Sequence, residues 1–291
     1  MSKKKQKLIV IAGPTAVGKT SYAISLAKKL NTVILSADSR QIYTGMPIAT
    51  AQPTMDERQG VPHYLIGHID PKSHYSAGQF EREAILLLEK LFLEHDTIIL
   101  TGGTGLYIDA VIKGLDEFPP IDPSIRLELN ETYAQSGLQI LLKELEAADP
   151  AYAKIVDKQN HRRIIRALEF IRSSGQPFSS FRKNKPKDRF FETETILLER
   201  DRDILYDRIN RRVLLMLDAG LLAEAKKWYP LRDYNSTQTV GYKELFEHFD
   251  GHISLERAIE LIQQNTRRYA KRQLTWFRRL NIDEIVLLDS D

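Results

Sequence analysis

Eight residues near the start of the 291-residue chain have the types and spacing of a phosphate-binding loop. They are Gly13, Pro14, Thr15, Ala16, Val17, Gly18, Lys19 and Thr20, which match the pattern G-x-x-x-x-G-K-[ST]. In such a loop, backbone N–H groups and the positive end of a helix surround an anion. Lys19 adds a mobile positive charge, and the Thr20 hydroxyl can bind Mg²⁺. The loop predicts a phosphorylated ligand but does not identify it.

Two further polar segments follow apolar runs, and we expect them beside the loop because ligands bind where parallel strands end. In residues 36–43, Asp38 can accept a proton or bind magnesium through water. Alternatively, Asp38 caps the next short helix, as Asp often does. In residues 101–107, glycines and threonines stand where a nucleotide hydrolase usually has an acidic residue. This second segment argues against ATP hydrolysis as the purpose of the loop.

Arg208 and Arg212 lie four residues apart on an expected helix over 202–218, so they share one face. Two guanidinium groups on one face can bind a diphosphate through paired hydrogen bonds. The alternative, which these residues alone favour, is pairing with nearby acids: Asp207, Asp218 or Glu224.

Two segments are strongly basic although the net charge of the chain is only +3. Residues 158–187 contain nine Lys or Arg and one acid, and residues 266–279 contain six Lys or Arg and no acid. The second segment also carries aromatic residues, a mixture typical of RNA-binding surfaces. The segments indicate a polyanionic partner, or they are solvated helix faces. For Trp276, a structural role as a core anchor is the favoured interpretation.

Short apolar runs alternate with helical patterns, which predicts a parallel sheet with helices on both faces. Strands are expected over 8–12, 32–35, 97–100, 195–198 and 285–288, and helices over 21–30, 79–94 and 202–218. From about 114 to 191 the pattern is helical and interrupted by prolines. We therefore predict an α/β core over 1–115 and 192–291, with a helical insertion domain over 116–191.

The composition excludes several kinds of site. Because the chain has no cysteine, it has no disulfide, no thiolate nucleophile and no Cys-based zinc site. The seven histidines show no metal-ligand spacing. No apolar run approaches the roughly 18 residues of a membrane-spanning helix. We expect a cytoplasmic protein.

Seven segments, in this order, resemble those of the bacterial tRNA dimethylallyltransferases, also called tRNA isopentenyltransferases. They are GPTAVGKT at 13–20, SADSRQIYTGMPIATAQP at 36–53, GGTGLY at 102–107, HRRIIRALE at 161–169, RINRRVLLML at 208–217, VGYKE at 240–244 and KRQLTWFR at 271–278. The phosphate-binding loop is shared with many kinases, whereas the motifs at 38–43 and 271–278 are much more specific. The resemblance runs nearly from end to end of the chain.

The resemblance implies a P-loop NTPase-like core and a prenyl transfer to RNA. In that reaction a dimethylallyl group moves from dimethylallyl diphosphate to the N6 amine of adenosine 37, 3′ to the anticodon, in tRNAs that read codons beginning with U. The products are N6-isopentenyladenosine and diphosphate. The resemblance assigns the loop, Lys19, Thr20 with Mg²⁺, and Arg208 or Arg212 to the diphosphate leaving group. It assigns Asp38 the role of accepting a proton from the adenine amine.

The resemblance also implies contacts with the anticodon stem-loop of tRNA. The matching positions are Asp38, Ser39, Arg40, Gln41, Thr104, Arg126, Arg162, Arg163, Arg166, Gly241, Lys243, Lys271, Arg272, Gln273, Trp276 and Arg278. Arg162 departs from the family, because many relatives carry Gln there. The insertion is expected to hold the anticodon stem, and the target adenosine is expected to flip out of its stack. We expect a monomer without an obligate protein partner.

Two other functions remain open from the residues. A small-molecule or nucleotide kinase would hold ATP in the loop and place Asp38 on the acceptor hydroxyl, but it gives the basic segments no role. A non-catalytic RNA-binding protein would use the basic segments, but it does not explain why Asp38 and the arginine pair accompany the loop.

Overall fold

The computed structural model describes residues 6–119, 121–182 and 185–289. The chain divides into two compact units, one comprising the segments up to Gly114 and from Asp188 onward, the other Leu115–Lys187. Each unit has its own buried core. Among the described helices, none is long and apolar enough to cross a membrane.

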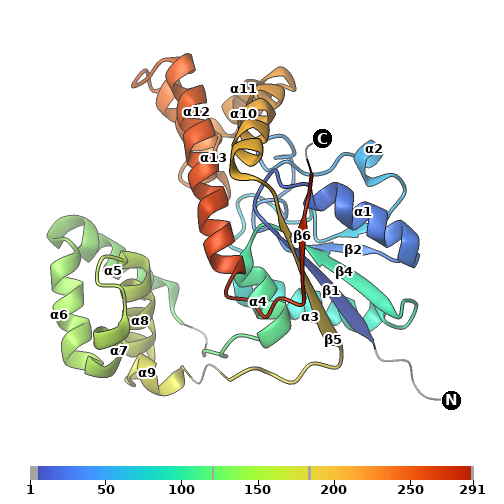
Figure 1. The fold of residues 1–291 in the computed structure, drawn as a ribbon. Helices are drawn as coiled ribbons and strands as arrows, with labels where there is room; N and C mark the ends of the chain where they lie inside the picture. Colours follow the sequence, from blue (N-terminus) through green and yellow to red (C-terminus); the bar gives the residue numbers. More distant parts are fainter. Residues whose placement is uncertain (1–5, 120, 183–184, 290–291) are drawn as a thin grey trace. The chain divides into compact units, whose positions relative to one another are not determined.

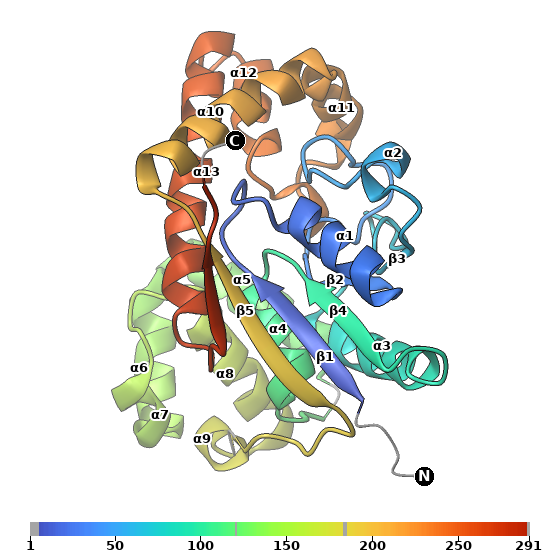
Figure 2. The same cartoon turned by 45° about the vertical axis from the view of Figure 1, so that its right-hand side comes forward.

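The first unit is built on a parallel six-stranded sheet, in the order β3-β2-β4-β1-β5-β6 (Figure 2). The strands are β1 (Lys7–Ala12), β2 (Ile34–Ser36), β3 (His63–Tyr64), β4 (Thr97–Thr101), β5 (Glu192–Glu199) and β6 (Glu284–Leu287). The predicted parallel sheet is confirmed, with all five expected strands present. The sequence missed β3, because two half-buried residues at a sheet edge leave no periodic pattern.

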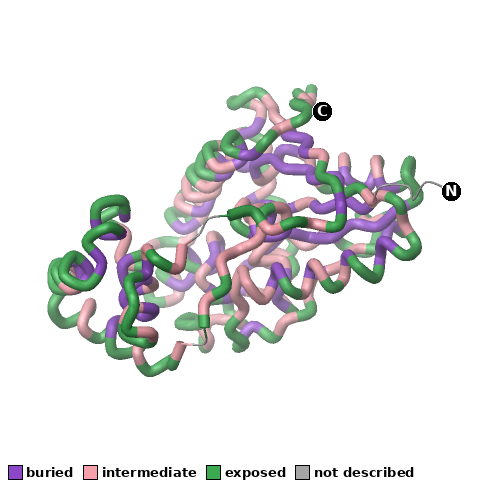
Figure 3. Tube along the Cα trace, turned by 90° about the horizontal axis from the view of Figure 1, so that it is seen from below, coloured by how far each residue is buried: buried purple, intermediate pink, exposed green. Residues whose placement is uncertain are grey.

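Helices cover both faces of this sheet (Figure 1). The helices of this unit are α1 (Lys19–Leu30), α2 (Met55–Arg58), α3 (Ala77–Leu91), α4 (Gly105–Lys113), α10 (Arg202–Asp218), α11 (Leu221–Trp228), α12 (Tyr242–Phe249) and α13 (Leu255–Phe277), with 3₁₀ turns η1 (Tyr229–Leu231) and η2 (Asn235–Thr237). Of these, α3 and α4 pack on one face of the sheet and α1 and α10 on the other. Side chains alternate along β1: Leu8 and Val10 pack towards α3 and α4, whereas Ile9 and Ile11 pack towards α1 and α10. Buried residues therefore run along the inner strands, whereas edge strands β3 and β6 are partly buried or exposed (Figure 3).

A further core cluster fixes the chain that follows β2. Ile42, Tyr43 and Met46 are buried together with residues of α10 to α13. Glu224 at the start of α11 accepts the backbone N–H groups of Ile48 and Ala49, both at 2.9 Å. The segment after Asp38 is thus held by apolar packing and by a carboxylate.

Among the described residues of the second unit, the regular elements are all helices, joined by turns and loops. This unit contains α5 (Pro123–Ser136), α6 (Leu138–Ala148), α7 (Pro150–Ile155), α8 (His161–Ser174) and α9 (Phe178–Phe181) around their own apolar cluster. The predicted helical insertion is confirmed as part of the fold. Residues 188–191, which the sequence placed in the insertion, belong to the first unit. Arg189 pairs there with Glu81 at 2.9 Å, and Phe191 is buried in the core.

Candidate active site

The phosphate-binding loop joins the end of β1 to the start of α1. Gly13 must be glycine, because a Cβ there would lie 2.8 Å from the carbonyl oxygen of Leu198 on β5. Gly18 has a φ of 117° and begins the helix. The loop therefore packs against the neighbouring strand and directs the N-terminus of α1 at its own centre, as the sequence predicted.

The ammonium group of Lys19 lies on the loop itself. Its Nζ donates hydrogen bonds to the carbonyl oxygens of Gly13 at 2.8 Å and Pro14 at 2.7 Å. Burial lowers the pKa of Lys19 to about 7, while the charge of Asp38 raises it and that of Arg212 lowers it further. Lys19 is thus a cation that is partly stripped of water and that an anion in the loop would stabilise in its charged form.

This lowered pKa predicts a pH dependence of anion binding. Above about pH 7 free Lys19 loses its proton, so pyrophosphate must bind together with a proton and its affinity falls as the pH rises. We compare the rise in the Kd of pyrophosphate between pH 8 and 9, without divalent cations, in the wild type and in Lys19→Arg. The rise per pH unit should be nearly tenfold larger in the wild type, because Arg keeps its charge. Calorimetric titration measures both slopes. The titration of pyrophosphate itself is common to the two proteins, so equal slopes would contradict the prediction.

Arg208 and Arg212 of α10 both reach the loop. Arg208 Nε donates to the carbonyl oxygen of Ala16 at 2.9 Å, and Arg212 Nη1 donates to Thr15 Oγ1 at 3.4 Å. Burial is the main cause that lowers the pKa of each guanidinium group. Of the acids proposed as alternative partners, Asp207 pairs with Arg211 and Glu224 accepts backbone N–H groups. The face shared by Arg208 and Arg212 is therefore directed at the loop.

A third arginine at the loop was missed from the sequence. Arg200 follows β5 directly, and its Nε donates to the carbonyl oxygen of Val17 at 3.3 Å. Its position immediately after an apolar strand was the available signal, because polar residues at the carboxyl ends of parallel strands face the ligand site.

Asp38 caps a turn and not the short helix that the sequence suggested, because residues 39–51 form turns and the next helix is α2. Its Oδ1 accepts the backbone N–H groups of Arg40 at 2.9 Å and Gln41 at 3.3 Å, the turn-capping arrangement. Its Oδ2 is directed towards Gly103, where a Cβ would lie only 2.9 Å from it. The carboxylate also acts electrostatically on Lys19 and Arg212. One oxygen thus orients the side chain and leaves the other at the turn of Gly103, and the carboxylate is close enough to the loop cations for their charges to interact.

The glycine-rich turn after β4 lies against the segment of Asp38. A Cβ on Gly102 would lie 2.2 Å from the carbonyl oxygen of Ala37, so the two backbones touch. Thr104 Oγ1 accepts the backbone N–H of Ser39 at 2.9 Å. These contacts confirm that the two strand ends lie side by side.

Helix α13 reaches into this site with one face and is exposed on another. Gln273, only 4% exposed, bonds to Thr15 and Gly103, and Tyr269 OH donates to the carbonyl oxygen of Gly103 at 3.2 Å. Trp276 Nε1 donates to Asp109 Oδ2 at 2.9 Å, which supports the prediction that this ring is an anchor. Lys271 and Arg272 are exposed on α13, and Arg278 and Arg279 are exposed directly after the helix ends.

The remaining predicted tRNA contacts fall into two groups. In the first unit, Arg40 Nη1 donates to the carbonyl oxygen of Asn235 at 2.6 Å, and Gly241 and Lys243 lie at the start of α12. In the second unit, Arg162 and Arg163 are exposed on α8. Arg126 and Arg166 pair with Glu169 at 2.9 and 3.6 Å. The two groups lie in separate units of the chain, and their contact with RNA stays a prediction.

The donor set for a metal is small. The described residues contain no group of three or more His, Asp or Glu that could hold an ion. The Thr20 hydroxyl is exposed on the first turn of α1, and Asp38 contributes a carboxylate near Lys19. This set fits a hard cation such as Mg²⁺ that keeps several waters and binds mainly through phosphate oxygens.

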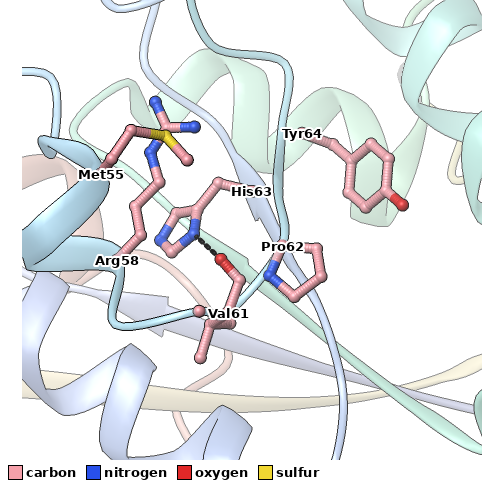
Figure 4. Close-up of a pocket in the computed structure, with 7 residues that line it drawn as sticks. Met55, Arg58, Val61, Pro62, His63 and Tyr64 are labelled. Atoms are coloured by element: carbon pink, nitrogen blue, oxygen red, sulfur yellow. Dashed lines mark hydrogen bonds between the residues drawn. The ribbon is translucent and has the colours of Figure 1, made fainter.

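A pocket elsewhere in the first unit has no connection with these residues. It has a volume of about 320 Å³ and is lined by Met55, Arg58 and residues 60–64, beside edge strand β3 (Figure 4). Within it, His63 Nδ1 bonds to the carbonyl oxygen of Val61 at 2.8 Å. None of the predicted site residues lines it.

Comparisons with known proteins agree on one family. The family model described as IPP transferase matches residues 41–280. A tRNA dimethylallyltransferase of Christiangramia forsetii is 50% identical over 272 residues, which are 94% of this chain and 90% of that protein. One of Cytophaga hutchinsonii is 48% identical over 93% of this chain and 89% of its own.

Two solved structures are similar as well. A tRNA isopentenylpyrophosphate transferase from Bacillus halodurans has a TM-score of 0.71 and 42% identity, covering 98% of this chain and 90% of its own. A eukaryotic dimethylallyltransferase acting on tRNA has a TM-score of 0.83 and 29% identity, and the match covers 98% of this chain and 74% of that one. The chain therefore belongs to the IPP transferase family.

Proposed function

We propose that this protein transfers a dimethylallyl group from dimethylallyl diphosphate to the N6 amine of adenosine 37 in tRNAs that read codons beginning with U. The observation that carries the proposal is the position of Asp38. Its Oδ2 lies beside a glycine turn, and its charge acts on Lys19 and Arg212 at the phosphate-binding loop. A proton acceptor and a diphosphate site thus share one end of the sheet.

The loop and its cations suit a diphosphate leaving group. When the carbon–oxygen bond of the donor breaks, its electron pair goes to the diphosphate and positive charge develops on the allyl carbon. Lys19, Arg212 and the loop N–H groups stabilise the negative charge that forms. Thr20 would hold Mg²⁺, which supplies further neutralisation of the diphosphate. No water-activating group is required for this step.

The acceptor side of the reaction needs a base. The exocyclic amine of adenine is a weak nucleophile, since its lone pair is delocalised into the ring. As the new carbon–nitrogen bond forms, the amine loses a proton, and Asp38 Oδ2 accepts it. The capped Oδ1 fixes the direction of this acceptor. The adenosine must leave its stack to reach the carboxylate, as in base flipping.

The kinase alternative accounts for fewer features. It requires ATP in the loop, and it leaves the end of β4 and the turn that follows, Thr101 to Thr104, without an acid that organises the metal and the nucleophile. The relatives at 48–50% identity carry the name tRNA dimethylallyltransferase, which supports the prenyl transfer.

The RNA-binding side of the proposal rests on the basic residues. The exposed face of α13 and the arginines of α8 would bind the anticodon stem-loop through its phosphates. We further propose that the enzyme acts as a monomer in the cytoplasm.

A single incubation tests the function. The protein is mixed with Mg²⁺, unmodified tRNA and either labelled dimethylallyl diphosphate or γ-labelled ATP, and the nucleosides are analysed by mass. We expect adenosine to gain one dimethylallyl group at position 37 while ATP stays intact. Phosphate transfer from ATP without modified adenosine would establish the kinase instead.

A further inference from the structure

One buried side chain connects the two halves of the site. Gln273 on α13 accepts the backbone N–H of Thr15 with Oε1 at 2.8 Å and donates to the carbonyl oxygen of Gly103 with Nε2 at 2.8 Å. Thr15 belongs to the phosphate-binding loop, and Gly103 to the turn after β4. A carboxamide offers an acceptor and a donor at one side-chain end, so it can bridge an N–H and a C=O.

The bridge lies beside the proposed base. A Cβ on Gly103 would be 2.7 Å from Gln273 Nε2 and 2.9 Å from Asp38 Oδ2, so both groups border the same point. Tyr269 OH would be 3.5 Å from that point and also bonds to the Gly103 carbonyl. The two hydrogen bonds of Gln273 therefore connect the loop to the turn that borders the Asp38 carboxylate.

We propose that Gln273 is a positioning residue for alkyl transfer, which holds the diphosphate-binding loop at a fixed distance from the turn that borders Asp38. The resemblance to the family placed Gln273 among the tRNA contacts. Its burial and its two backbone partners point to the interior of the site instead. This inference rests on the proposed function.

The physical reason is geometric. The loop fixes the donor through its diphosphate, and the turn and Asp38 fix the acceptor. Transfer needs the allyl carbon and the amine in line at close approach, and a misplacement of about 1 Å can cost about a hundredfold in rate. The bridge contributes little to binding either substrate alone, because each half of the site keeps its other contacts.

The test is Gln273→Met, which keeps the length of the side chain and removes both hydrogen bonds. We expect kcat at saturating substrates to fall ten- to a hundredfold. The Kd values for pyrophosphate and for unmodified tRNA, measured separately, should stay within about threefold of the wild type. Gln263→Met is the matched control, because Gln263 lies on the same helix and donates to the carbonyl oxygen of Asn210 at 3.3 Å, away from the loop. It should leave kcat within about twofold.

Gln273→Glu guards against a folding defect in the first variant. It keeps an acceptor for the Thr15 N–H and replaces the donor to Gly103 with an oxygen. Because the new carboxylate repels an anion in the loop, we expect weaker pyrophosphate binding, a tRNA affinity within about threefold of the wild type and, at saturating substrates, a kcat still reduced at least tenfold.

Three outcomes would overturn the inference. Weaker tRNA binding with an unchanged kcat would make Gln273 an RNA contact. If the melting temperature, both affinities and kcat all fall in both variants, Gln273 is a general structural residue. An unchanged kcat with unchanged affinities would remove any role. The wild type is assayed in parallel, and its failure to transfer the group would reject the proposed function separately.

Discussion

Replacing Asp38 with Asn is expected to lower the rate of dimethylallyl transfer by about a thousandfold, since a positioned general base contributes roughly 10² to 10⁴ in rate. The amide keeps an oxygen that can accept the N–H groups of Arg40 and Gln41, so the turn is preserved. It cannot accept the proton from adenine. Single-turnover transfer, measured with saturating dimethylallyl diphosphate and tRNA, gives the rate of the chemical step.

Asp38→Ala completes this comparison, because it removes the turn cap as well as the base. We expect Asp38→Ala to be as inactive as Asp38→Asn, with tRNA binding largely retained in both. If Asp38 served only as a cap, Asn would restore activity and Ala would not. Asp70 offers a matched control. Its Oδ1 also caps a turn, accepting the N–H of Lys72 at 2.8 Å, and Asp70→Asn should leave transfer unchanged.

The loop, the sheet and the flanking helices could be predicted because their signals are local. β1, the loop and α1 are consecutive in the chain, and the apolar runs alternate with helical periodicity. β5 was predicted too short for a physical reason. Its first residues, Glu192 to Glu194, are polar and pair with the outer end of β1, where the sheet is open to solvent.

The contacts that assemble the site could not be predicted, because their partners are far apart in sequence. The bond between Gln273 and Thr15 spans 258 residues, and that between Arg200 and Val17 spans 183. A pattern of residue types cannot say which face of α13 is buried against a loop at the other end of the chain. For Asp38, the sequence offered two roles as alternatives, whereas the two carboxylate oxygens can serve one each.

The second large effect on the transfer rate is expected for an arginine of α10, and substitutions there distinguish the roles of Arg208 and Arg212. We expect Arg212→Gln to lower the rate of transfer by about 10² to 10³, the usual loss when a group that stabilises developing charge is removed. Arg212 is close enough to Asp38 for their charges to interact, its guanidinium group reaches Thr15, and burial strengthens its field. The same single-turnover measurement applies, with the Kd of pyrophosphate determined alongside.

Arg211→Gln is the control on the same helix, because Arg211 is exposed and pairs with Asp207. It should change the rate by less than about twofold, as expected for a surface ion pair. Arg208→Gln should chiefly weaken pyrophosphate binding, since Arg208 is tied to the backbone of the loop at Ala16. A larger loss of rate in Arg208→Gln than in Arg212→Gln would exchange the two roles. The arginine nearer to Asp38 would then serve to hold the loop, and its neighbour one turn away would stabilise the leaving group.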